Sequence, residues 1–142
     1  MDHELTLPPE VASVGASRRF VREALTAWHL EQLVDTATLL TSEIVTNSVL
    51  HARTSIVLSV HRSEGDIVTI SVHDDSAYLP RLRQHTIDAT TGRGLELLDR
   101  LADEWHIESE GDGKCVVFTI SASSDPWAAV TGAAWAEREA DL

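Results

Sequence analysis

The chain has 142 residues, 43% of them hydrophobic, and a formal net charge of −12, which fits one soluble domain with a single core. Such an acidic chain argues against direct nucleic-acid binding, since phosphate contacts need clustered lysine and arginine, and against docking on anionic membranes. The sequence shows neither the run of about 18 apolar residues that a transmembrane helix needs nor the basic and apolar regions of a signal peptide, so we expect a cytoplasmic protein.

The N-terminal segment predicts an edge strand followed by a helix. Glu4–Leu7 alternates between polar and apolar residues and stops at Pro8, as an edge strand would. Ser13 is placed to cap a helix over Val14–Trp28. The apolar residues of that segment recur at helical spacing, so we expect Trp28 to pack in the core rather than to bind a cofactor.

A second helix is predicted over Leu39–Ala52, with the sequence LLTSEIVTNSVLHA. Its spacing places Glu43, Asn47 and His51 four residues apart, in one polar stripe of carboxylate, amide and imidazole. An isolated E-x-x-x-N pair ordinarily lies on a solvated helix face and has no function, so a functional interpretation needs support from other motifs in the chain. The core-facing stripe beside it consists of Leu40, Ile44 and Ser48.

Two alternating segments, Ser55–His61 and Ile67–His73, predict a hairpin that turns at Ser63–Asp66. Extending the second strand by one residue gives Asp74 the same parity as the apolar face. An inward-pointing acid is costly unless something donates hydrogen bonds to it. After the polar stripe of Glu43, Asn47 and His51, Asp74 is therefore the second unusual feature of the sequence.

A loop and a glycine-rich helix start follow the hairpin. Leu79–Thr91 lacks periodicity and is locally positive, which favours an anionic ligand nearby, although it could also be a plain connector. Gly92-Arg93-Gly94 precedes a predicted helix over Leu95–Glu104, whose N-terminus could hold a phosphate. The motif is not G-x-G-x-x-G and follows no strand directly, which excludes a Rossmann fold.

The last predicted strands are Glu104–Ser109 and Cys115–Ser121, joined by a turn at Gly111–Gly113. Cys115 is the only cysteine, which excludes an internal disulfide and a cysteine-based zinc site. We expect one domain over residues 1–122 and a tryptophan-containing extension over 123–142 whose role the sequence does not indicate.

The motifs E-x-x-x-N, D-x-S and G-x-G-L occur in this order, and the arrangement resembles the GHKL ATPase family with the Bergerat ATP-binding fold. Within that family it is similar to the small bacterial anti-sigma-factor and protein serine kinase branch, and the phrases LLTSEIVTNSVLHA, VHDDSAYLP and TGRGLELLDRLADEWHIE look like those of actinobacterial members. The resemblance covers residues 4–121. We expect an α/β two-layer sandwich whose mixed, mostly antiparallel sheet has helices on one face.

The resemblance implies a role for each matching residue. Glu43 would orient or deprotonate the attacking hydroxyl, and Asn47 would bind Mg²⁺ that bridges the phosphates of ATP. Asp74 would accept a hydrogen bond from the adenine amino group, and Ser76 would stand beside it where a glycine often occurs. The backbone N–H groups that reach the phosphates would belong to Gly92, Arg93, Gly94 and Leu95. The loop at 79–91 would be the ATP lid, and His51 receives no chemical role.

The sequence departs from the family at two places. The segment Asp74–Tyr78 has no glycine, which limits the close approach of backbone to a ligand. Lys114 and Cys115 stand where many members have small hydroxyl residues.

The resemblance implies an ATP- and Mg²⁺-binding regulator that holds a sigma factor inactive and phosphorylates a serine of a STAS-type anti-anti-sigma partner; such proteins are often homodimers. The alternative is a non-catalytic module of the same fold that only sequesters a sigma factor or a STAS protein, and the altered segment at 74–78 favours it. A free-standing ATP hydrolase is less well supported, because no transducer domain couples turnover to work.

Overall fold

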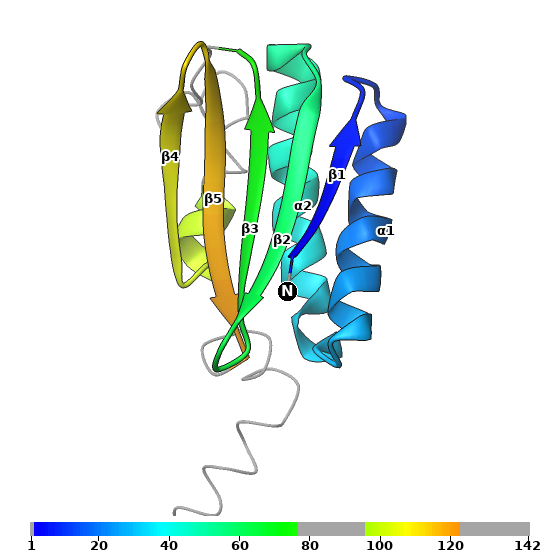
Figure 1. Cartoon of the computed structure of the whole chain (residues 1–142), viewed down its shortest axis with the longest axis vertical. Helices are drawn as coiled ribbons and strands as arrows, with labels where there is room; N and C mark the ends of the chain where they lie inside the picture. The colour runs from blue at the N-terminus through cyan, green and yellow to red at the C-terminus, as the bar shows by residue number, and fades with distance from the viewer. Residues whose placement is uncertain (1, 77–95, 123–142) are drawn as a thin grey trace, which may run out of the picture.

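The computed structural model describes residues 2–76 and 96–122. Five strands form one sheet in the order β1-β2-β3-β5-β4, and the helices pack on one face of it (Figure 1). The strands are β1 (Asp2–Leu7), β2 (Ile56–Ser63), β3 (Ile67–Asp74), β4 (Glu104–Glu110) and β5 (Gly113–Ser121).

The helical layer begins with α1 (Ala12–Ala27) and α2 (Val34–Asn47), which pack against each other. A 3₁₀ turn, η1 (Glu31–Leu33), joins them, and a π-helical turn, η2 (Ser48–Ala52), continues α2. Residues 96–101 form a further helical segment, and it contributes the fully buried Leu98 to the core. No helix in the described part of the chain is long and apolar enough to cross a membrane.

Strand alternation positions the core between the sheet and the helices. In β2, the buried side chains alternate with more exposed ones, and β3 and residues 116–120 of β5 follow the same rule. The apolar stripes of α1 and α2 cover this face, as their helical periodicity requires. The largest fully buried side chains include Phe118, Leu25, Leu33, Leu40 and Ile56.

Most predicted elements are confirmed, with shifted bounds. Trp28 is a core residue at 5% exposure, as expected. The expected cap was wrong: the residue before α1 is Val11, and the Ser13 hydroxyl donates instead to the Pro8 carbonyl oxygen. The predicted α-helix over 39–52 was also wrong at its end, because it changes to a π-turn after Asn47.

Three further expectations need correction. All strand pairs among the described residues are antiparallel, so the sheet in this part of the chain is not mixed. Glu104 begins β4 rather than ending a helix, and Gly113 pairs with Glu110 as the first residue of β5 rather than lying in the turn. The tail at 123–142 lies outside the described residues.

Gly113 is required by a close approach between β5 and the end of β3. A Cβ atom built on Gly113 would lie 2.3 Å from the backbone oxygen of Asp74 and 3.0 Å from the Cα of Asp75. The distance to the Asp74 oxygen is much shorter than a van der Waals contact, and a backbone atom cannot move aside by a side-chain rotation. Gly113 therefore lets β5 lie tightly against the strand end that carries Asp74.

We predict that Gly113→Ala lowers the free energy of unfolding by about 1–3 kcal/mol, because the methyl group forces a backbone shift in a packed sheet. Urea unfolding of the purified protein measures it. Gly15→Ala is the matched control: its Cβ meets nothing closer than 3.7 Å, and alanine is the better helix former, so that variant should gain about 0.4–1 kcal/mol. Equal stability of Gly113→Ala and wild type would contradict the close approach.

Candidate functional site

The carboxylate of Asp74 is buried at the end of β3, where α2 and the start of β5 also lie (Figure 1). Its exposure is 1%, which confirms the inward orientation predicted from strand parity. In the sheet, Asp74 is directly opposite Lys114 of β5, and Lys114 is itself only 5% exposed. An acid and a base therefore face each other inside the protein.

Four hydrogen bonds converge on the Asp74 carboxylate. The Lys114 ammonium donates to both oxygens, at 2.9 Å to Oδ1 and 2.8 Å to Oδ2. The Ser48 hydroxyl donates to Oδ2 at 2.9 Å, and the backbone N–H of Ser76 donates to Oδ1 at 3.0 Å. A carboxylate offers about four lone-pair positions, so these donors fill its capacity. We call Asp74, Lys114, Ser48 and Ser76 the carboxylate cluster.

The π-helical turn brings Ser48 to the cluster. The backbone N–H of Arg53 donates to the Ser48 carbonyl oxygen at 3.1 Å, five residues back, and Arg53 then adopts a left-handed conformation with φ of 57°. Such single π-turns widen a helix and redirect its side chains, and they are frequent at functional sites. Here the turn directly follows Asn47, so the amide and the serine occupy the last turn before the chain enters β2.

The Asn47 side-chain amide has hydrogen-bonding groups that could bind a ligand. Asn47 is 7% exposed, and neither its Oδ1 nor its Nδ2 has a hydrogen-bond partner among the described residues. A buried amide without partners costs free energy, so its presence needs an explanation. Glu43, one turn earlier, is half-buried, and so is His51. The predicted polar stripe is therefore partly sheltered rather than fully solvated.

The predicted phosphate-binding residues Gly92, Arg93, Gly94 and Leu95 lie outside the described residues, as does the predicted lid at 79–91. Ser76 is the last described residue before that gap, and its backbone already belongs to the carboxylate cluster. In the described part of the chain, no group of three or more histidine, cysteine, aspartate or glutamate side chains could hold a metal ion. A metal there would need ligands of another kind.

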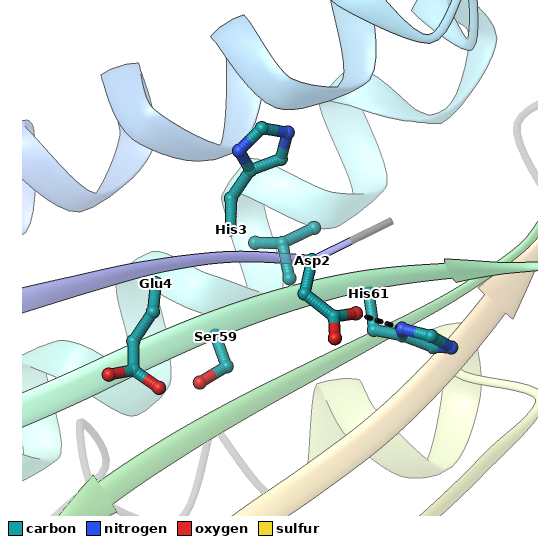
Figure 2. Close-up of a pocket in the computed structure, with 6 residues that line it drawn as sticks. Asp2, His3, Glu4, Ser59 and His61 are labelled. Carbon is teal, nitrogen blue, oxygen red and sulfur yellow. Dashed lines mark hydrogen bonds and ion pairs between the residues drawn. The ribbon is translucent and has the colours of Figure 1, made fainter.

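A hollow of about 220 Å³ lies at the edge strand β1, away from the carboxylate cluster (Figure 2). The Asp2 carboxylate meets the His61 imidazole there, and this hydrogen bond is the main reason why the pKa of Asp2 is lowered. His61 is near the end of β2, whereas Ile56 at its start pairs with Asp74. The hollow is therefore at the opposite end of the sheet from the carboxylate cluster.

Two members of the carboxylate cluster were not predicted from the sequence. Ser48 was assigned only to the core-facing stripe, and Lys114 was noted only as a departure from a family pattern. The parity rule that placed Asp74 inward could have found Lys114, because Val116, Phe118 and Ile120 are buried at the same spacing. The hydroxyl of Ser48 gave no such signal, since its direction depends on the π-turn.

A sequence model of the histidine kinase-like ATPase domain family matches residues 7–120, which is most of the chain. The chain belongs to this family. A comparison with curated proteins finds no match. The family implies that this histidine kinase-like ATPase domain binds a nucleotide.

Solved structures share the fold. The RsbU and RsbW domains of Rv1364c from Mycobacterium tuberculosis match with a TM-score of 0.65 and 19% identity over 85% of this chain and 32% of that one. The SiaB–SiaC complex from Pseudomonas aeruginosa matches with a TM-score of 0.63 and 11% identity over 83% of this chain and 88% of that one. The histidine kinase domain of the blue-light activated histidine kinase EL346 from Erythrobacter litoralis matches with a TM-score of 0.54 and 19% identity. The match covers 78% of this chain and 61% of that one.

The two halves of the site fit a magnesium nucleotide unequally. Asn47 fits, because a sheltered amide oxygen without a partner among the described residues is a suitable ligand for Mg²⁺, which is usually held by few protein groups together with phosphates. Asp74 does not fit as it stands, because its lone pairs already receive four protein donors. A base amino group could bind Asp74 only after one donor leaves.

We predict that Asp74→Asn lowers the free energy of unfolding by about 3–5 kcal/mol, because it leaves the Lys114 ammonium buried without its counter-charge. The matched control is Asp66→Asn, which breaks the half-exposed pair with Arg62 at 2.6 Å and should cost under about 1 kcal/mol. Chemical denaturation of both variants measures the difference. Equal losses would show that the Asp74–Lys114 pair is no more important than a surface pair.

Proposed function

We propose that this domain is an ATP- and Mg²⁺-binding anti-sigma regulator that phosphorylates a serine of a STAS-type anti-anti-sigma partner. The observation that carries the proposal is the Asn47 amide, buried at the end of α2 with both polar atoms lacking partners among the described residues. A Mg²⁺ ion that also binds ATP phosphates would give this amide the partner it lacks. Membership of the histidine kinase-like ATPase family supports the same ligand.

The other site residues take roles consistent with phosphoryl transfer, which depends on positioning and charge neutralisation. Glu43 is one helical turn from Asn47 and would orient the attacking serine hydroxyl. Backbone N–H groups of Gly92, Arg93, Gly94 and Leu95 would receive the phosphates. Asp74 would accept from the adenine amino group, with Ser76 next to it.

Two structural neighbours support a function that involves a partner protein. One contains an RsbW domain beside an RsbU domain, and the other was solved as a complex of SiaB with SiaC. We propose that this chain likewise acts on a second protein and holds a sigma factor in the same cycle. The cytoplasmic location and the homodimer expected from the resemblance stay predictions.

A second candidate is a non-catalytic module that regulates only by sequestering a sigma factor or a STAS protein. The observation that favours it is the carboxylate cluster, in which Lys114 donates to both oxygens of Asp74 and so leaves no acceptor position for the amino group of a base. The two candidates differ in whether the chain binds MgATP at all.

We predict that Asn47→Ala weakens MgATP binding by at least about tenfold, the value of one lost contact to a charged group. The same variant should be as stable as wild type or more stable, because it removes a buried amide that pays a desolvation cost. Calorimetric titration and thermal unfolding measure the two effects. Thr46→Ala is the control, since the Thr46 hydroxyl donates to the Ser42 carbonyl oxygen within the helix. Unchanged MgATP affinity in Asn47→Ala would contradict the metal assignment.

We predict that Glu43→Gln lowers serine phosphorylation by about 10²–10⁴-fold, the usual contribution of a positioned base, while MgATP binds as in wild type. The assay follows transfer of radiolabelled phosphate from ATP to a purified STAS-domain protein from the same genome. Glu23→Gln, on the exposed face of α1, is the control for loss of one carboxylate. Normal phosphorylation by Glu43→Gln would remove Glu43 from the mechanism.

A further inference from the structure

We propose that Lys114 is an internal competitor for the base-binding carboxylate, so that a nucleotide must displace its ammonium before Asp74 can bind the amino group of adenine. The inference rests on the proposed function, because it concerns the same nucleotide site. Lys114 is the only lysine in the chain. The structure assigns it to the place where a hydrogen-bond donor of the ligand would go.

The hydrogen-bond acceptor positions of Asp74 are all occupied. Each carboxylate oxygen receives two donors: Lys114 and the Ser76 N–H on Oδ1, and Lys114 and the Ser48 hydroxyl on Oδ2. With about two lone-pair positions on each oxygen, an additional N–H donor has no acceptor position left. Binding of an amino group is therefore an exchange of donors and not an addition.

Of the donors to Asp74, Lys114 is the one that can leave. Ser76 donates through its backbone, and Ser48 is fixed by the π-turn at the end of α2. Lys114 donates through the end of a flexible four-carbon side chain, which can move without a change in the backbone. It also occupies one position on each oxygen, so its departure opens both sides of the carboxylate.

Displacement of Lys114 is costly because the ion pair is buried. Lys114 is 5% exposed, and it lies directly opposite Asp74 in the register of β3 and β5. The close approach at Gly113 holds this end of β5 against the end of β3. Separating a buried, doubly hydrogen-bonded pair leaves charge without compensation until the ammonium finds another partner. Lys114 therefore lowers the affinity for any nucleotide that needs Asp74.

The competitor predicts a characteristic pattern of ligand discrimination. In the wild type, a nucleotide gains little from an amino group at position 6 of the base, because the gain is offset by breaking the ion pair. In Lys114→Thr, the carboxylate is available, and that amino group adds a hydrogen bond to a charged acceptor. Such a bond is equivalent to about 10- to 100-fold in affinity.

The experiment titrates the full chain calorimetrically with ATP and with purine riboside 5′-triphosphate, which lacks the 6-amino group, both with Mg²⁺. We expect Lys114→Thr to bind ATP at least about tenfold more tightly than wild type does and to prefer ATP over the analogue by a similar factor. Wild type should bind the two ligands about equally. Lys114→Gln keeps a neutral donor for Asp74, so it serves as a second variant if Lys114→Thr folds poorly, and its gain in ATP affinity should be intermediate.

Arg62→Thr is the matched control, because it removes one positive charge from β2 at the end of the sheet away from Asp74. Its ATP affinity should equal that of wild type, whereas an equal gain in Arg62→Thr and Lys114→Thr would overturn the inference in favour of a general charge effect. Tight ATP binding and strong preference over the analogue in wild type would overturn the competitor and leave the proposed function intact. Failure of every protein to bind either ligand would overturn both proposals.

Discussion

The buried ion pair between Asp74 and Lys114 is the interaction on which the rest of the site depends. It joins the end of β3 to the start of β5, and the Ser48 hydroxyl attaches the end of α2 to the same carboxylate. Gly113 allows the start of β5 to lie close to the backbone at the end of β3, and the π-turn orients Ser48 toward Asp74. Removing either charge would leave the other without compensation in the core.

The Asp74 carboxylate has a structural role in the described part of the chain, and the proposed function would give it a binding role as well. An acid that is fully satisfied within the protein stabilises the fold but has no capacity for a ligand, whereas Asn47 on the neighbouring helix turn has the opposite character. Its amide lacks partners among the described residues and costs free energy that a ligand could recover. Asn47 therefore has hydrogen-bonding capacity for a ligand, whereas Asp74 has none in this structure.

Much of the fold was predictable because hydrophobic periodicity fixed the strands and helices. The same parity rule placed Asp74 inward, and the spacing of Glu43 and Asn47 indicated one helix stripe. The π-turn at Ser48–Ala52 was not predictable, because it depends on tertiary contacts rather than on local propensity. The partner of Asp74 was missed for a related reason: Lys114 is 40 residues away in sequence, and only the strand register shows that the two side chains meet.

The most direct test of this account observes Lys114 by nuclear magnetic resonance. Because the chain has a single lysine, selective ¹⁵N-lysine labelling gives one backbone amide signal and one ammonium signal. We expect the ammonium signal of the free protein to be that of a buried, hydrogen-bonded group, and we expect MgATP to shift it as Asp74 exchanges its donor. An ammonium signal typical of an exposed lysine, or one that MgATP leaves unchanged up to millimolar concentration, would contradict the account.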